Sequence, residues 1–180
     1  MKAVLDACVI FPTVLREILL GVAGNGLYQP LWSDRILREW VLATAKLGPV
    51  AQIQAEGEAV LLRAAFPCAM VRAQPGIEAR ILLPDAGDHH VLAVAIAGHA
   101  DCIVTFNARD FPRHVLAAEG IERRDPDGLL WQIWSDHPGE VAEVVAGVQA
   151  TAERLAGQAL PLKALLKRAQ LPKLAKAMVG

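Results

Sequence analysis

Residues 82–112 of the chain have the sequence LLPDAGDHHVLAVAIAGHADCIVTFNARDFP. Residues 93–97 are all alanine, valine or isoleucine, so a helix over 88–97, buried beside a sheet, is predicted. A short apolar strand is predicted over 102–105. Acidic side chains flank these two elements, at Asp85, Asp88, Asp101 and Asp110. Carboxylates at the ends of buried elements are costly unless something neutralises them, and a divalent cation does so well.

Apolar strands and helix-patterned segments alternate along the rest of the chain. The predicted strands are 3–5, 81–83, 102–105 and 121–123. The predicted helices are 13–22, one that begins at Ser33 or Asp34, one that runs through 53–62, 88–97 and 115–118. This alternation predicts an α/β fold, in which helices cover both faces of a mostly parallel sheet.

The Pro126-Asp127-Gly128 turn signal is predicted to end the α/β core. The chain would then consist of a domain over residues 1–126 and a helical C-terminal extension over 127–180. Two amphipathic helices are predicted in the extension, one through Val141 and Leu155 and one over 161–170. Their apolar stripes are typical of packing on the core or on a second subunit, and a partner-binding helix is the alternative.

Charge is distributed unevenly along the chain. The formal net charge is −1, yet the six bases and one acid from Thr151 onward give +5 and the remaining residues carry −6. Three of these bases, Lys163, Lys167 and Arg168, lie opposite the apolar side of the last predicted helix. They are predicted to attract the phosphates of a substrate. A solvated helix face is the alternative.

Composition describes an ordered globular protein: 180 residues, 54% of them apolar and 21% charged. The cysteines, Cys8, Cys68 and Cys102, are unpaired by spacing and are predicted to be buried, reduced thiols. No signal peptide is predicted, because Asp6 interrupts the first apolar run, and no apolar run is long enough for a bilayer. A cytoplasmic protein without a membrane segment is expected.

Acidic and amide side chains follow the predicted strands. Asp6 comes after the first strand, Asp88 begins the helix that follows another, and Asn107 and Asp110 follow the strand 102–105. Ligands of open parallel sheets bind at the carboxyl ends of the strands, so these side chains are expected to converge. Oxygen ligands of this kind suit Mg²⁺ or Mn²⁺. Glu39, among apolar neighbours in the second helix, is the predicted extra ligand.

Each acid also has a purely structural interpretation. Asp88 is a possible helix N-cap, Asp85 a turn residue, and Asp110 a cap of the turn before Phe111. Asp101 precedes its strand and is predicted to lie outside the site. Glu39 taken alone would be a solvent-facing helix acid.

Other catalytic or binding motifs have little support. His89 and His90 are adjacent and cannot easily share one metal, and both are predicted to lie at the surface. A contact of His90 or His89 with a substrate phosphate is the alternative. Neither a Gly-rich phosphate loop nor a Ser-His-Asp or Cys-His set is present.

Four segments resemble the PIN-domain family of metal-dependent ribonucleases, many of whose bacterial members are VapC-type toxins of toxin–antitoxin pairs. The segments are LDACVIFP (5–12), SDRILREW (33–40), LPDAGDHHVLAVAIAGHAD (83–101) and IVTFNARDFP (103–112). The resemblance covers roughly residues 2–125. It implies a three-layer α/β/α sandwich and a cluster of acids that hold Mg²⁺ or Mn²⁺.

By this resemblance, Asp6, Glu39 and Asp88 match the first three acids of the family. The fourth, usually an aspartate two residues after Thr105, is Asn107 in this chain, with Asp110 close by. The resemblance thus implies Asp6, Glu39, Asp88 and Asp110 as catalytic residues, with Asn107 as a further metal ligand. Thr105 is included among the predicted substrate-binding residues.

Two departures from the family pattern affect the site. Ala7 and Cys8 replace the usual Thr or Ser and Asn, which removes a polar group that supports the site. Asn107 removes one negative charge, which weakens binding of a second metal unless Asp110 compensates.

The leading hypothesis is a metal-dependent endoribonuclease in which metal-activated water attacks an RNA phosphodiester. The toxin of an operon pair is the biological role considered for such an enzyme. The expected partners are RNA, a cognate antitoxin protein and a second copy of the chain. The alternative is a catalytically weak PIN-like module that binds nucleic acid or a partner protein. A phosphatase with Asp6 as nucleophile is a third hypothesis, which Cys8 disfavours because it replaces the usual second acid.

Overall fold

The computed structural model describes all 180 residues, which form two units. The sheet unit comprises Met1–Phe11 and Gln29–Arg124, and the helical unit comprises Pro12–Tyr28 and Asp125–Gly180. The chain therefore passes from the sheet unit into the helical unit, returns, and leaves again after Arg124. None of its helices combines the length and the apolar character needed to span a membrane.

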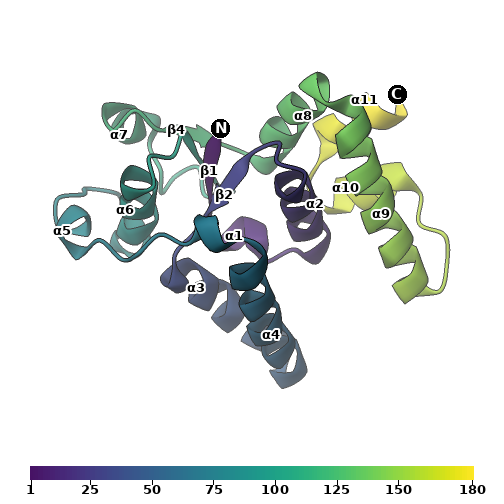
Figure 1. The fold of residues 1–180 in the computed structure, drawn as a ribbon, viewed down its shortest axis with the longest axis horizontal. Coiled ribbons are helices and arrows are strands. Elements are labelled where there is room, and N and C mark those ends of the chain that lie inside the picture. Colours follow the sequence, from purple (N-terminus) through teal and green to yellow (C-terminus); the bar gives the residue numbers. More distant parts are fainter. The chain divides into compact units, whose positions relative to one another are not determined.

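The sheet unit is built around four parallel strands in the order β2-β1-β3-β4 (Figure 1). The strands are β1 (Lys2–Leu5), β2 (Gln29–Leu31), β3 (Cys102–Val104) and β4 (Glu122–Arg124). All three residues of β3, and three of the four in β1, are buried. Continuous apolar runs of this kind are typical of the central strands of a parallel sheet.

Helices and 3-10 turns connect these strands. They are α1 (Ala7–Ile10), α3 (Asp34–Thr44), η1 (Ala45–Leu47), α4 (Pro49–Ala65), η2 (Pro67–Ala69), α5 (Pro75–Glu78), η3 (Ala86–Asp88), α6 (His89–Ala97) and α7 (Arg113–Ala118). Ser33 caps α3 by accepting a hydrogen bond from the Ile36 N–H at 3.3 Å. Residues 91–95 of α6 are all buried, and the helix contacts β1 and β3. The predicted α/β fold with a parallel sheet is confirmed. The predicted burial of the cysteines is wrong for Cys68, which is exposed, whereas Cys102 is buried and Cys8 is half-buried.

One predicted strand is wrong. Residues 81–83 have no regular structure: Leu82 is 84% exposed, and Pro84 directly follows the segment. The remaining strand is instead β2, whose Pro30 pairs with Ala3 of β1. Proline lacks an N–H donor and is tolerated at the edge of a sheet, which is where β2 lies.

The helical unit contains α2 (Thr13–Gly24), α8 (Pro126–Asp136), α9 (Pro138–Ala156), α10 (Leu162–Arg168) and α11 (Pro172–Val179). Helix α2 packs against α9, where a Cβ added at Gly21 would lie 2.5 Å from Val144 Cγ1. Buried Asp127 of α8 accepts the backbone N–H groups of Lys173 and Leu174, at 2.8 and 3.0 Å. Its carboxylate thereby satisfies the first free donors of α11 and holds that helix against α8.

Candidate functional site

A pocket of about 400 Å³ lies beyond the carboxyl ends of β1 and β3 in the sheet unit. Its polar lining comprises Asp6, Cys8, Glu39, Lys46, Asp88 and Asn107. In the strand order, β1 is followed along the chain by β2 at one edge of the sheet, and β3 by β4 at the other edge. Ligands of parallel sheets bind where the strand order reverses in this way. The structure thus brings together four of the five predicted metal ligands, all except Asp110.

Asp6 directly follows β1 and is 5% exposed. It precedes α1, yet its side chain makes no capping hydrogen bond to that helix. Its Oδ2 accepts hydrogen bonds from Thr105 Oγ1 at 2.7 Å and from Cys8 Sγ at 3.1 Å. The Thr105 hydroxyl in turn accepts the Asn107 N–H at 2.9 Å. These contacts fix the orientation of the Asp6 carboxylate and leave Oδ1 for another partner.

Cys8 supplies the polar contact that the sequence predicts to be missing beside Asp6. Besides donating to Asp6, its sulfur accepts the Phe106 N–H at 3.3 Å. Burial, with the negative charge of Asp6 as a second cause, raises the pKa of Cys8 to about 12. The thiol therefore keeps its proton at neutral pH and remains a hydrogen-bond donor.

Asp88 lies where η3 passes into α6. Its side chain makes no capping hydrogen bond, whereas Asp85 accepts the Gly87 N–H at 2.7 Å. The structural interpretation as a turn cap therefore describes Asp85 and not Asp88. Burial raises the pKa of Asp88 to about 6, and the charges of Asp6, Asp110 and Asp85 add to this effect. The carboxylates are thus close enough to repel one another.

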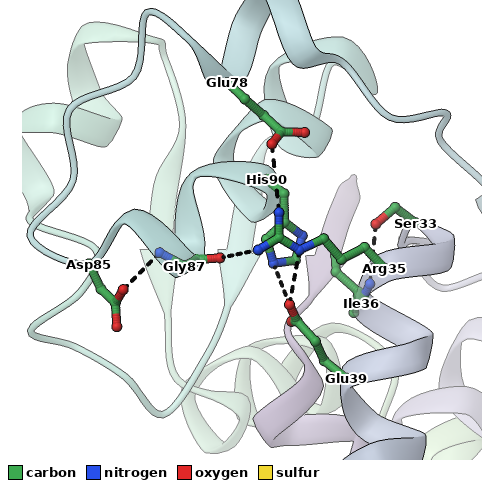
Figure 2. A network of polar contacts seen from close by, with 8 residues as sticks. All are labelled: Ser33, Arg35, Ile36, Glu39, Glu78, Asp85, Gly87 and His90. Atoms are coloured by element: carbon green, nitrogen blue, oxygen red, sulfur yellow. Dashed lines mark hydrogen bonds and ion pairs between the residues drawn. The ribbon is translucent and has the colours of Figure 1, made fainter.

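Glu39 projects from α3 into a network of polar contacts (Figure 2). Its Oε1 accepts a hydrogen bond from Arg35 Nε at 3.2 Å, and His90 Nε2 lies 3.1 Å away. Arg35 also donates to the Gly87 carbonyl at 3.2 Å and lies 3.7 Å from Glu78. Burial acts to raise the pKa of Glu39, but His90 and Arg35 outweigh it and the pKa is lowered. The network joins α3 to the segment that precedes α6.

Asn107 and Asp110 differ in their relation to the pocket. Asn107 is exposed and lines it, whereas Asp110 is half-buried and is not among the lining residues. Asp110 still lies near enough to raise the pKa of Asp88. This part of the chain therefore presents the Asn107 amide at the pocket, while the Asp110 carboxylate acts on Asp88 without lining the pocket.

The positions of two residues at the site, His90 and Lys46, were not predicted from the sequence. His90 is 2% exposed and contacts Glu39, so its predicted place at the surface is wrong. Lys46 in η1 is exposed and lines the pocket without any ion pair of its own. Positions 39, 43 and 46 all line the pocket, and their spacing is that of one helix face, which is a signal in the sequence.

The remaining predicted substrate contacts are not among the residues that line this pocket. Thr105 is 3% exposed, and its hydroxyl is engaged with Asp6 and Asn107, a position that favours support of the Asp6 carboxylate. The exposed bases Lys163, Lys167 and Arg168 belong to α10 of the helical unit. Lys163 Nζ donates to the Gly180 carbonyl at 3.2 Å.

The donors of the pocket fit a hard divalent cation in kind, because carboxylate and carboxamide oxygens are the ligands that Mg²⁺ and Mn²⁺ prefer. As the side chains stand, no three Asp, Glu, His or Cys groups are placed to hold an ion together. Glu39 is turned toward Arg35 and His90. Joint coordination therefore requires side-chain rotation toward Asp6.

Comparison with known proteins supports the family suggested by these residues. A family model described as PIN domain matches residues 2–109, more than half of the chain, and this span includes Asp6, Glu39, Asp88 and Asn107. Searches of curated proteins and of solved structures gave no match. With its parallel sheet and with this acidic pocket at the carboxyl ends of the central strands, the chain belongs to the PIN domain family, whose fold is of a nuclease type.

Proposed function

We propose that the chain is a metal-dependent endoribonuclease that hydrolyses RNA phosphodiester bonds in the pocket of the sheet unit. The observation that carries this proposal is the convergence of Asp6, Glu39 and Asp88 on one pocket from separate elements. Repulsion among carboxylates is part of what raises the pKa of Asp88 to about 6. A cluster that accumulates negative charge in this way favours binding of a cation.

Mg²⁺ or Mn²⁺ would be held by Asp6, Glu39, Asp88 and Asn107. Asp110, which does not line the pocket, would add to the negative charge that attracts the cation. Bound there, the cation would lower the pKa of a water molecule and polarise the scissile phosphate. Thr105 and Cys8 keep the Asp6 carboxylate oriented, as Arg35 and His90 do for Glu39.

Lys46 supplies the one positive charge among the residues that line this pocket. Its ammonium group forms no ion pair with the neighbouring acids, so it is available to an RNA phosphate. A phosphate carries negative charge into an acidic pocket, and Lys46 would offset part of the resulting repulsion. It acts in this proposal as a substrate-positioning residue.

The test is cleavage of a labelled single-stranded RNA by the full chain, freed of metal with EDTA and then supplied with Mn²⁺ or Mg²⁺. Asp88→Asn should lower the rate on the order of 100-fold, the scale seen when one electrostatic contact to developing charge is lost. Asp85→Asn is the matched control, because it removes a charge three residues away while its amide oxygen still accepts the Gly87 N–H. Equal losses in both variants, or no metal-dependent cleavage at all, would contradict the proposal.

A second candidate is a PIN-like module that binds RNA or a partner without cleaving it. Asn107 at the fourth position and the engagement of Glu39 by Arg35 favour it, because both reduce the charge offered to a cation. In that case calorimetric titration would detect no Mn²⁺ binding, while RNA binding would remain and would weaken with salt.

The proposed biological setting is that of a toxin neutralised by a cognate antitoxin protein, with a homodimer as the working form. Expression of the chain in bacterial cells should then arrest growth, and Asp88→Asn should relieve the arrest at equal protein level. Arrest by both forms would contradict the toxin role while leaving the nuclease activity to be decided by the RNA assay.

A further inference from the structure

A second groove lies within the helical unit, between α8 and α11. It has a volume of about 470 Å³ and is lined by Trp131, Lys173, Lys176 and Ala177. Trp131 is 46% exposed, although the neighbouring residues Leu129, Leu130 and Ile133 of the same helix are buried. The indole therefore belongs to the face of α8 that is turned away from the unit's core.

The wall formed by α11 is fixed by a buried contact. Asp127 is 6% exposed, and its two carboxylate oxygens accept the N–H groups of Lys173 and Leu174. Asp127 and Trp131 are four residues apart on α8, so the contact that anchors α11 lies one turn from the indole. The relation of Trp131 to the two lysines is thereby set by the packing of the two helices.

The polar groups around the groove are unpaired. Lys173 and Lys176 are three residues apart and neighbours on the surface of α11, and neither ammonium group forms a hydrogen bond or an ion pair. The indole N–H of Trp131 has no acceptor either. The chain from Thr151 onward carries +5, so this surface adds to a positive field.

An exposed indole beside two free ammonium groups matches the chemistry of single-stranded nucleic acid. Aromatic side chains stack on bases without regard to sequence, and lysines neutralise the phosphates that flank a stacked base. We propose that this groove binds single-stranded RNA, with one base stacked on Trp131 and the adjoining phosphates on Lys173 and Lys176. The proposal rests on the proposed function in its choice of RNA, and it assigns to the helical unit a substrate-binding role separate from the acidic pocket.

The test measures binding of a fluorescein-labelled oligouridine of about 12 nucleotides to the full chain in EDTA, so that no cleavage occurs. Trp131→Ala should raise Kd by about 5- to 150-fold, the range for loss of one stacked base, and Trp131→Phe should restore much of the affinity. Lys176→Gln should lower the slope of log Kd against log salt by about 0.7, as expected for one lost phosphate contact.

Arg154→Gln is the matched control for charge, since Arg154 is an exposed base of the same unit outside the groove. It should change Kd by no more than about twofold, because only non-specific attraction is lost. Equal weakening by Arg154→Gln and Lys176→Gln would assign binding to net charge and overturn the proposal. Thermal melting of each variant by circular dichroism confirms that the fold is retained.

Two further outcomes separate the groove from its alternatives. Unchanged RNA binding by Trp131→Ala overturns the proposal. If that variant also dissociates a dimer, the groove is instead part of an interface between copies of the chain. The test of oligouridine binding to the groove is also independent of the acidic pocket. A protein that binds oligouridine through the groove but never cleaves RNA contradicts only the proposed nuclease, whereas a nuclease indifferent to Trp131→Ala contradicts only the groove.

Discussion

The carboxyl group of Asp88 is held where ionisation is unfavourable. Its pKa of about 6 results from burial and from the charges of Asp6, Asp110 and Asp85. Because the folded protein retains this proton to a higher pH than the unfolded chain, stability should fall as the pH rises from about 4 through 6. At neutral pH the ionised Asp88 therefore opposes folding, which is a cost that a catalytic site can carry.

Asp88→Asn should consequently stabilise the protein at pH 8 while it slows cleavage. Asp88 is half-buried and in part open to solvent, which screens some of the repulsion, so the increase in Tm should be only about 2 °C. The difference should become small near pH 3.5, where Asp88 is protonated in the folded protein and mostly protonated in the unfolded chain. Thermal melting in EDTA at the two pH values measures it, and Mn²⁺ should raise the Tm of the wild type more than that of the variant. A lower Tm for the variant at pH 8 would contradict this account.

Thr105 supports the buried carboxylate of Asp6 with a 2.7 Å hydrogen bond. Thr105→Val keeps the shape of the side chain and removes this donor, so the free energy of unfolding should fall by about 1.5–3 kcal/mol. Urea unfolding measures the loss. Thr151→Val is the control, because Thr151 is exposed on α9, and it should change stability by less than about 0.5 kcal/mol. Similar losses in both variants would show that the Asp6 contact contributes little.

The acids of the site are largely predictable from the sequence because each stands next to an apolar segment where a charge serves no packing purpose. Asp6 after β1 and Asp88 before α6 are of this kind. Lys46 and His90 are harder to predict, because their importance depends on which element lies opposite them. His90 lies in the first turn of α6, and only the approach of α3 places Glu39 within 3.1 Å of it.

At the scale of elements, the packing of α2 on α9 leaves no room at Gly21. A Cβ there would meet Val144 Cγ1 at 2.5 Å, closer than such atoms approach, so either the Val144 side chain or the two helices would have to shift. Gly21→Ala should therefore destabilise the helical unit by about 1–3 kcal/mol, the usual cost of overpacking, despite the better helix propensity of alanine. Thermal or urea unfolding measures the change.

Gly147 on α9 is the matched control for this substitution. An added Cβ would meet nothing within 4 Å, so Gly147→Ala gains helix propensity without a clash. It should stabilise the protein by about 0.4–1 kcal/mol. A stabilising effect at both positions would mean that α2 and α9 separate easily at Gly21.

Some helices and strands could be predicted from the sequence, and others could not. The helices α3 and α6 have apolar patterns that extend over more than two turns, and α3 also has the Ser33 cap, so both could be predicted. The strand β2 has only three residues and contains Pro30, and its pairing with β1 is a long-range contact that no local pattern signals. Residues 81–83 are the converse case, because an apolar triplet by itself does not fix a strand where no partner strand is available.

For the whole molecule, the helical unit is discontinuous in sequence. Its helix α2 precedes most of the sheet unit in the chain, while its other helices follow Asp125. The predicted domain boundary at residue 126 therefore stays a prediction, to be tested by truncation. A chain of residues 1–126 retains α2 without α9, so the face of α2 that packs against α9 in the full chain, around Gly21, loses its cover.

We expect the 1–126 chain to melt at a lower temperature than the full protein and to bind a hydrophobic dye. Each aliphatic side chain that becomes exposed should cost roughly 1.5–3 kcal/mol. Differential scanning fluorimetry and light scattering of both chains measure stability and aggregation. An equally stable, monomeric 1–126 chain would show that the sheet unit accommodates α2 without the rest of the helical unit.

The split of the helical unit also affects how the protein is made. Helix α2 leaves the ribosome early, yet α9, against which it packs, is synthesised more than 100 residues later. At about 5–20 residues per second, the apolar face of α2 waits on the order of 5–20 s for this partner. During that interval the nascent chain is a natural client for a chaperone that shields short apolar helices, and slow synthesis of residues 125–180 should lower the yield of folded protein.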